Sequence, residues 1–316
     1  MSAVLARAAP PGSTIGIVTP GSPPEARADV ERGIAWWESN GYRVKLARGA
    51  LEQADWHAGS PEVRARDLQE AFADPEIDAI QTMRGGYGSA QVIPLLDFDA
   101  IRESPKAFVG VSDITALHVA LLSRADLATF YGPSLTMMGT ASAEFTTGRL
   151  LQMLAGGTTG PVPEDRNRLT VISIVGGKAS GRLVGGCLGD FIYTIGTPWE
   201  QDLDGAIFFF EDCNNAPIRI DRALLYLDQI GKLKGVRGIV VGELAGCEWY
   251  EHTSAPRSKT LENVLEDRLG PLGVPVLYGL PLGHGATQAT LPLGVEATVD
   301  ADALTLTIDE PALLVG

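Results

Sequence analysis

Apolar and polar positions follow two alternating patterns along the first 130 residues. Short apolar runs, typical of buried strands, alternate with stretches in which apolar residues recur every three or four positions, as in amphipathic helices. This alternation predicts a parallel sheet with helices on both faces. The predicted strands are Thr14–Val18, Tyr42–Leu46, Ala79–Met83 and Ala107–Val111, and the predicted helices are Glu25–Asn40, Pro61–Ala73, a stretch between RGGYGS and Leu96, and Asp113–Arg124.

The pattern changes after about residue 140. A helix is predicted over Ala141–Ala155, and the following GGTTGPVPEDRNR, Gly156–Arg168, is rich in Gly, Pro and polar residues, as linkers are. Strands dominate beyond it, so we expect a second, strand-rich α/β domain. The sequence predicts an N-terminal Rossmann-like domain (1–155), a linker (156–168) and a C-terminal domain (169–316). The active site is expected between the two domains. The predicted strands are Thr170–Val175, Gly181–Cys187, Ala206–Phe210, Gly238–Val241, Val274–Tyr278 and a hairpin over Gly294–Ile308, with helices at Pro217–Ile230 and Thr260–Leu269.

Composition narrows the class of protein. The 316 residues are 45% hydrophobic and 20% charged, as in ordinary globular proteins. The N-terminus lacks the charged start and long apolar core of a signal peptide, which predicts a cytoplasmic protein. The net charge of −14 argues against nucleic acid or an anionic membrane as partner. The cysteines, Cys187, Cys213 and Cys247, are odd in number and far apart, so we expect free thiols.

Ser112 is the first candidate for chemistry. In KAFVGVSDITALH a strand passes directly into a helix through Gly110-x-Ser112, a tight turn that exposes a serine beside free backbone N–H groups. Those N–H groups could stabilise an oxyanion. The fifth position of the G-x-S-x-G pattern is Ile114 rather than glycine, and serine is also a favoured helix N-cap. Both interpretations, nucleophile and cap, remain open on local sequence.

A nucleophilic serine needs a base and an acid that orients the base. His284 lies in GLPLGHGATQA, a glycine-flanked loop after a predicted strand, where it is either the base or an exposed loop histidine. Glu211 follows the apolar strand AIFFF, where a carboxylate needs a partner. That partner is either the base or an arginine of the following PIRIDR, Arg219 or Arg222. The order serine, acid, histidine is one of the known triad orders.

The RGGYGS segment, Arg84–Ser89, is a second candidate element. Adjacent glycines let the backbone approach a ligand closely, so one glycine N–H could be an oxyanion donor, and Arg84 could bind a substrate carboxylate. The alternative is a plain strand-to-helix turn. A phosphate-binding loop is disfavoured because the segment lacks the P-loop lysine.

Together these segments resemble the LD-carboxypeptidase family, serine peptidases that include muramoyltetrapeptide carboxypeptidases and microcin C immunity proteins. The resemblance covers nearly the whole chain. It is carried, in order, by IGIVTPGSPP, RGGYGS, FVGVSDITALH, GRLVGGCLG, FFFEDCNNAPIRIDRALLYL and GLPLGHG.

The resemblance implies a nucleophile at Ser112, an acid at Glu211 and a base at His284. It also implies an oxyanion hole from the backbone N–H groups of Asp113 and Gly86. The family uses no metal or organic cofactor and is commonly dimeric, so a homodimer is expected. One departure is Cys187 in GGCLG, where family members often have GGNL with a polar asparagine.

Three functions are consistent with these residues. The first is removal of the terminal D-alanine from murein tetrapeptides in peptidoglycan recycling, with a small peptide substrate. The second is an immunity-type peptidase that cleaves aminoacyl-nucleotide antibiotics, for which Trp249 and Tyr250 could stack on a base. The third is a non-catalytic two-domain ligand-binding protein. A metallopeptidase is disfavoured, because His252 beside Glu251 does not form H-E-x-x-H.

Overall fold

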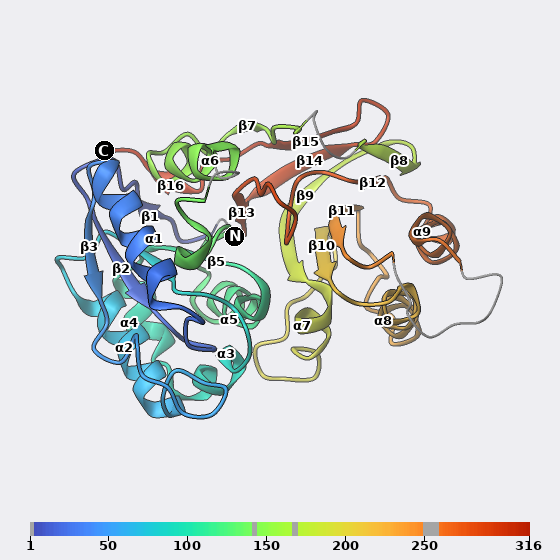
Figure 1. Cartoon of the computed structure of the whole chain (residues 1–316). Coiled ribbons are helices and arrows are strands. Elements are labelled where there is room, and N and C mark those ends of the chain that lie inside the picture. The colour runs from blue at the N-terminus through green and yellow to red at the C-terminus, as the bar shows by residue number, and fades with distance from the viewer. Residues whose placement is uncertain (1–2, 141–143, 166–169, 249–258) are drawn as a thin grey trace.

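Two sheets organise the chain, one in each half (Figure 1). The computed structural model describes residues 3–140, 144–165, 170–248 and 259–316. In these ranges a six-stranded sheet forms the centre of the N-terminal domain and an eight-stranded sheet that of the C-terminal domain. The predicted fold class, a parallel-sheet α/β domain followed by a strand-rich α/β domain, is confirmed.

The N-terminal sheet has the strand order β13-β6-β5-β4-β2-β3, and only the edge strand β13 is antiparallel to its neighbour among the strands described. Every residue of the central strands β2, β4 and β5 is buried. A parallel sheet is covered on both faces, which explains why these strands are mostly apolar. The strands are β2 (Thr14–Val18), β3 (Arg43–Leu46), β4 (Ala79–Thr82), β5 (Ala107–Gly110), β6 (Thr129–Tyr131) and β13 (Leu291–Leu293).

The helices of this domain lie close to their predicted positions. Helix α2 begins with Pro61 at its first position, and the Ser60 side chain accepts a hydrogen bond from the backbone N–H of Val63. The predicted start of the next long helix is wrong: a 3₁₀ turn at Ser112–Ile114 comes first, and α5 begins at Thr115. The helices are α1 (Arg27–Ser39), α2 (Pro61–Ala73), α3 (Ser89–Val92), α4 (Phe98–Glu103), α5 (Thr115–Ala125) and α6 (Glu144–Leu154).

The C-terminal sheet has the order β7-β15-β14-β9-β10-β11-β12-β8. Its centre, β9 to β12, is parallel, and the predicted hairpin is confirmed as β14 paired with β15. The short strand β7 lies inside the segment predicted as a linker. The elements are β7 (Gly160–Pro161), β8 (Ile172–Val175), β9 (Lys178–Cys187), β10 (Ile207–Cys213), β11 (Gly238–Ala245), β12 (Val276–Tyr278), β14 (Glu296–Asp300), β15 (Thr305–Ile308), α7 (Leu188–Ile192), α8 (Pro217–Gln229) and α9 (Leu261–Leu269).

Two late segments return to the N-terminal half of the chain. Strand β13 completes the N-terminal sheet by pairing with β6, and β16 (Leu313–Leu314) pairs with β1 (Ala6–Arg7). Neither short strand was predicted, because three or fewer residues carry no measurable periodicity. The chain therefore crosses between the halves more than once.

One apolar core continues across the domain boundary. It contains Phe130 and Tyr131 of β6 together with Phe209 of β10, and the rings of Tyr131 and Phe209 meet edge to face with their centroids 5.4 Å apart. A polar contact accompanies this packing: the backbone N–H of Cys187 donates to Thr115 Oγ1 over 2.9 Å. Burial of apolar surface is the main force that fixes such an interface, so the two domains hold a defined orientation.

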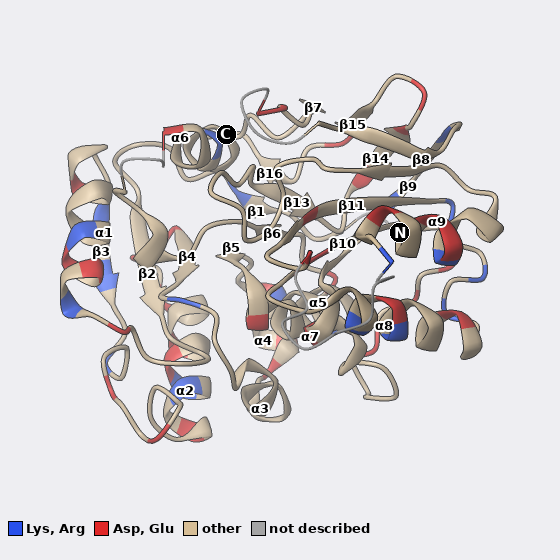
Figure 2. Cartoon of the chain, turned by 45° about the vertical axis from the view of Figure 1, so that its right-hand side comes forward, with Lys and Arg blue, Asp and Glu red and all other residues tan. Residues whose placement is uncertain are grey.

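Charged side chains of both signs are mixed along the outer helices (Figure 2). Figure 2 shows lysine and arginine beside aspartate and glutamate on α1, α2, α8 and α9. None of the helices in the described ranges is both long enough and apolar enough to cross a membrane.

The returning strand β13 should contribute strongly to stability. Leu291 has no exposed surface and belongs to the shared core, so Leu291→Ala should lower the free energy of unfolding by about 2–5 kcal/mol. Leu314→Ala is the matched control, because that leucine is 54% exposed and should cost less than about 0.5 kcal/mol. Urea denaturation followed by circular dichroism measures both, and equal costs would show that β13 is not part of the folding core.

Candidate active site

Ser112 lies on a sharp turn between β5 and α5. Its backbone φ is +67°, a left-handed conformation that is strained for a residue with a side chain. The N-cap positions of the 3₁₀ turn and of α5 are Val111 and Ile114, and Ser112 is the first residue of the 3₁₀ turn itself. The interpretation of Ser112 as a helix N-cap is therefore wrong, and the turn instead leaves the hydroxyl at the wall of a cavity.

Glu211 lies inside β10, whereas the sequence placed it just after the strand, and it has no exposed surface. Its Oε2 accepts hydrogen bonds from His284 twice, from Nδ1 at 2.8 Å and from the backbone N–H at 3.2 Å. Of the two partners considered for Glu211, the histidine is the one observed. No ion pair joins Glu211 to Arg219 or Arg222 in the described part of the chain.

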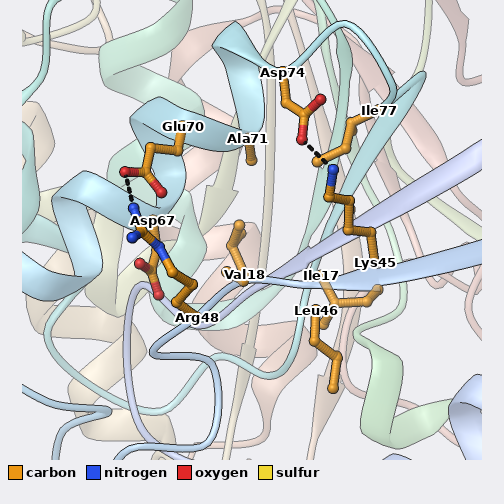
Figure 3. A pocket seen from close by; sticks show the side chains of 12 residues that line it. Ile17, Val18, Lys45, Leu46, Arg48, Asp67, Glu70, Ala71, Asp74 and Ile77 are labelled. Carbon is orange, nitrogen blue, oxygen red and sulfur yellow. Dashed lines mark hydrogen bonds and ion pairs between the residues drawn. The ribbon is translucent and has the colours of Figure 1, made fainter.

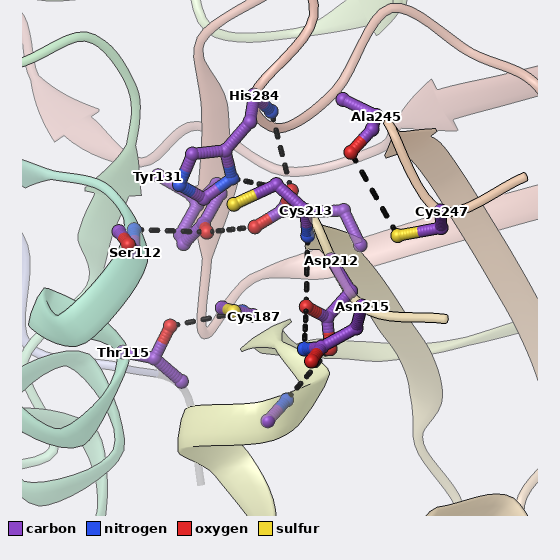
Figure 4. Close-up of polar contacts among 12 residues, drawn as sticks. Ser112, Thr115, Tyr131, Cys187, Asp212, Cys213, Asn215, Ala245, Cys247 and His284 are labelled. Atoms are coloured by element: carbon purple, nitrogen blue, oxygen red, sulfur yellow. Dashed lines mark hydrogen bonds and ion pairs between the residues drawn. The ribbon is translucent and has the colours of Figure 1, made fainter. Parts of the chain in front are cut away.

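The other oxygen of this carboxylate also has a partner. The hydroxyl of Tyr131, at the end of β6, donates to Glu211 Oε1 over 2.5 Å. The same hydroxyl accepts the backbone N–H of Ser112 at 3.1 Å. Figure 4 shows Ser112, Tyr131 and His284 turned toward one another where the two domains meet.

Ser112 and His284 line the same cavity, whose volume is about 270 Å³. No hydrogen bond between the Ser112 hydroxyl and His284 is present among the described residues, although both side chains line this cavity. Catalytic hydrogen bonds are often long in an empty site and shorten when substrate binds. The cavity is lined by Glu25, Asp29, Arg84, Gly85, Gly86, Val111, Ser112, Ser134, Thr136, Met137 and His284.

The RGGYGS loop packs directly against the serine. A Cβ atom at Gly85 would lie 2.7 Å from the Ser112 Cβ and 3.3 Å from its Oγ, so only glycine permits this approach. The backbone N–H groups of Gly86 and Asp113 have no acceptor among the described residues. The Asp113 carboxylate accepts from the N–H groups of Gly88 and Ser89, at 3.2 and 2.8 Å, and thereby ties the loop to the turn.

Arg84 stands at the edge of this cavity. Its Nη1 forms an ion pair with Glu25 Oε1 at 2.8 Å, and the two side chains are 27% and 78% exposed. An exposed ion pair of this kind contributes little free energy. A substrate carboxylate could therefore replace Glu25 at small cost.

The pKa of His284 is shifted far from the ordinary value. Burial lowers it, but contacts with Cys213 and with the Glu211 carboxylate outweigh burial and raise the pKa to about 10. The imidazole is therefore protonated at neutral pH. A histidine must lose this proton before it can act as a base.

The other two histidines in the described ranges, His57 and His118, do not join this group. His118 is buried in α5, where its ring nitrogens contact Thr129 Oγ1 and the Gly110 carbonyl, and burial lowers its pKa to about 4. The ring of His57 lies beside that of Tyr87, with centroids 5.3 Å apart. His252, Trp249 and Tyr250 lie outside the described residues.

Cys187 is buried at the domain contact rather than exposed in the cavity. Burial and nearby carboxylates raise the pKa of its thiol, so the thiol stays protonated and unreactive. Within the described ranges, no group of three or more His, Cys, Asp or Glu side chains has the arrangement of a metal site.

A larger cavity of about 320 Å³ lies elsewhere, between β2, β3 and α2 (Figure 3). Its basic side chains already have acidic partners: Lys45 pairs with Asp74 at 2.6 Å, and Arg48 pairs with Glu70. It contains no nucleophile beside a base. The smaller cavity with Ser112 and His284 is therefore the candidate active site.

Comparison with known proteins identifies the family. Residues 15–132 match the model of the LD-carboxypeptidase N-terminal domain, and residues 180–299 match that of the LD-carboxypeptidase C-terminal domain. The chain belongs to the LD-carboxypeptidase family. The family resemblance noted in the sequence is thus confirmed, and the protein is a serine carboxypeptidase by its family.

Similar proteins carry two kinds of name. A Bacillus subtilis (strain 168) protein named "Probable murein peptide carboxypeptidase" is 36% identical, over 94% of this chain and 92% of its own length. The muramoyltetrapeptide carboxypeptidase from Oxalobacter formigenes has a similar structure, with a TM-score of 0.80, 29% identity and coverage of 95% and 100%.

The second kind is the microcin C7 self-immunity protein MccF of Escherichia coli. It is 27% identical, over 96% of this chain and 94% of its own length. A structure of MccF in complex with glutamyl sulfamoyl guanosine matches with a TM-score of 0.90 and 25% identity, covering 98% of this chain and 100% of that one.

Tyr131 is the residue of this LD-carboxypeptidase that sequence reasoning missed. The segment TFYGP combines β-branched and aromatic residues before a Gly-Pro turn, which is a signal for a short strand. That signal could have predicted β6. It could not have predicted that the Tyr131 hydroxyl contacts both Ser112 and Glu211, because these contacts join distant parts of the chain.

The titration of His284 tests the electrostatics of the site. We expect the imidazole of this LD-carboxypeptidase to stay protonated through neutral pH and titrate near 10, and that of His118 to titrate near 4. Since folding raises the pKa of His284, its stabilising effect is present below about pH 6.5 and is lost as the pH rises toward 10. Imidazole NMR signals report both groups.

Cys213→Ala supplies the control for this titration. Removing the sulfur contact should lower the pKa of His284 while the Glu211 contact keeps it above 6.5. The pKa of His118 should not change. A wild-type His284 that titrates at or below 6.5 would show that the buried Glu211 carboxylate does not hold it in the charged form.

Proposed function

We propose that this LD-carboxypeptidase removes the terminal D-alanine from murein tetrapeptides by a Ser112–Glu211–His284 mechanism. The observation that carries the proposal is the hydrogen-bonded Glu211–His284 pair of one domain, which shares a cavity with the strained Ser112 turn of the other. The names of the similar murein peptide and muramoyltetrapeptide carboxypeptidases support this substrate.

In the first half of the reaction Ser112 Oγ attacks the carbonyl carbon before the D-alanine. His284 accepts the hydroxyl proton, and Glu211 holds the imidazole by its Nδ1–H so that Nε2 can act as the base. The free N–H groups of Asp113 and Gly86 stabilise the oxyanion. His284 then gives the proton to the leaving amine of D-alanine.

In the second half water attacks the acyl-enzyme. His284 takes a proton from the water, and the carbonyl–Oγ bond breaks as Ser112 regains its proton. No step needs a metal or an organic cofactor. Because His284 is protonated at neutral pH, kcat/KM should rise with pH above neutrality.

A carboxypeptidase must bind the free terminal carboxylate of its substrate. We assign this contact to Arg84, whose guanidinium lines the cavity and is paired only with the exposed Glu25 carboxylate among the ion pairs described. Guanidinium and carboxylate groups form paired, charge-assisted hydrogen bonds. This assignment explains why a longer peptide, whose carboxylate lies further away, would be a poor substrate.

Cleavage of aminoacyl nucleotides is the second candidate function. It is favoured by the high structural similarity to MccF bound to glutamyl sulfamoyl guanosine. Both reactions are acyl transfers that the same serine could perform. A non-catalytic binding protein is disfavoured by membership of a peptidase family.

Assembly and location belong to the proposal as well. The family resemblance supports a homodimer with a small peptide substrate, and we propose a cytoplasmic location. The net charge of −14 argues against nucleic acid or an anionic membrane as partner. Sedimentation velocity would measure the dimer.

Ser112→Ala tests the reaction. Wild type should release D-alanine from L-Ala-γ-D-Glu-meso-diaminopimelate-D-Ala, and the variant should lower kcat/KM by about 10³-fold or more, because the nucleophile is gone. Mass spectrometry of the products measures release.

Ser123→Ala is the matched control for this experiment, since Ser123 lies in α5 outside the cavity. It should retain full activity, and EDTA should have no effect on wild type. Equal activity of wild type and Ser112→Ala would refute the serine mechanism. Release of the amino acid from a glutamyl sulfamoyl nucleoside, but not from the tetrapeptide, would favour the second function.

Arg84→Gln tests recognition of the carboxylate. We expect KM for the tetrapeptide to rise about tenfold or more with a smaller change in kcat, because a charge-assisted contact to bound substrate is lost. The tetrapeptide with a C-terminal amide should be cleaved equally poorly by wild type and variant. Arg48→Gln, in the other cavity, is the control, and an unchanged KM in Arg84→Gln would exclude the assignment.

A further inference from the structure

Tyr131 occupies an unusual position between the two halves of the proposed catalytic machinery. Its side chain has no exposed surface, and its hydroxyl lies between the backbone of the nucleophile turn and the carboxylate of the acid. One group therefore contacts Ser112, from the N-terminal domain, and Glu211, from the C-terminal domain, although 80 residues separate it from Glu211 in sequence.

The contact with Glu211 fixes the orientation of the carboxylate. A buried carboxylate needs a hydrogen-bond partner on each oxygen. With Oε1 held by the Tyr131 hydroxyl, Oε2 points at the Nδ1 and backbone N–H of His284. Without the hydroxyl, Oε1 would lose its partner and rotation of the carboxylate would no longer be restricted.

The contact with Ser112 acts on the strained turn. The Ser112 N–H is used by the Tyr131 oxygen, so it cannot serve as an oxyanion donor, and the neighbouring N–H of Asp113 is left for that role. The hydrogen bond also offsets part of the strain of the left-handed backbone at Ser112.

We propose that Tyr131 is a positioning residue that couples the Ser112 turn to the Glu211–His284 pair through its hydroxyl. The proposal rests on the triad of the proposed function and adds to it a fourth side chain. Tyr131 does not touch the reacting atoms. It acts by holding the acid in the orientation that directs His284 and by holding the nucleophile's backbone.

The Tyr131 hydroxyl keeps its proton in the presence of the titratable groups around it. Burial and the Glu211 charge raise the pKa of Tyr131, so the phenol remains a donor. His118, whose ring centroid is 5.7 Å away, is neutral above about pH 4. The Cys187 thiol is also neutral, because burial raises its pKa.

Tyr131→Phe removes the hydroxyl and keeps the ring that packs on Phe209. We expect kcat for tetrapeptide cleavage to fall about 10- to 100-fold, with KM changed less than about threefold, since no substrate contact is lost. Without a donor on Oε1, the Glu211 carboxylate should interact more strongly with the protonated imidazole and raise the pKa of His284. The acidic limb of the pH profile should therefore move to higher pH.

Tyr42→Phe is the matched control. Tyr42 is a buried tyrosine of the same domain, edge to face with Trp37, and its hydroxyl donates to the Ala9 carbonyl over 3.2 Å. It should lose stability as Tyr131→Phe does and keep wild-type kcat and pH profile. Equal kcat values for the two variants would overturn the proposal, because Tyr131 would then have only a structural role.

The coupling is measured in a double-mutant cycle with Glu211→Gln. If Tyr131 acts largely through Glu211, Tyr131→Phe should slow the Glu211→Gln enzyme less than about threefold. The readout is covalent labelling of Ser112 by a fluorophosphonate, in which the Oγ–P bond forms, the P–F bond breaks, fluoride leaves and His284 takes the hydroxyl proton. Additive effects of the two substitutions would overturn the coupling.

A second variant covers the case in which Tyr131→Phe does not fold. A 3-fluorotyrosine at position 131 keeps the ring and hydroxyl but donates more strongly to Glu211, so the acidic limb of labelling should move to lower pH. An unchanged limb would overturn the proposal. If Ser112→Ala abolishes labelling but the Tyr131 variants label as fast as wild type, only the role of Tyr131 is refuted. If labelling persists in Ser112→Ala, the triad itself is refuted.

Discussion

A fully buried carboxylate lies where the two domains meet, and much of the site depends on satisfying it. Glu211 is held in β10, in the apolar core shared by both sheets, and an unpaired charge there would cost several kcal/mol. Its partners come from both directions: Tyr131 from the N-terminal sheet and His284 from the loop after β12. Satisfying this one group therefore brings a histidine of one domain toward a serine turn of the other.

Close backbone approach makes this arrangement possible. A side chain at Gly283 would collide with Glu211 Oε2, as one at Gly85 would collide with Ser112. Glycine at these two positions lets the histidine loop and the RGGYGS loop reach the carboxylate and the serine. The contacts around Ser112 also hold its backbone in the strained left-handed conformation, which would otherwise relax.

The proposed nucleophile and base lie at one cavity without being hydrogen-bonded to each other. Ser112 and His284 share a cavity without a hydrogen bond, and the imidazole carries a proton at neutral pH. Relatives with different named substrates have this fold. In the proposed function, the buried Glu211–His284 pair serves the acyl transfer, and a cavity-wall group such as Arg84 serves substrate recognition.

The sequence by itself determined the fold class, most long elements and the family, because strand and helix periodicity is local and the motifs occur in a fixed order. It also supplied Ser112, Glu211 and His284 as candidates. Tertiary structure alone decided that Glu211 pairs with His284 rather than with an arginine of α8, that β13 returns to the N-terminal sheet, and that Tyr131 joins both domains. These are contacts between residues far apart in the chain, and periodicity carries no information about which distant partners meet.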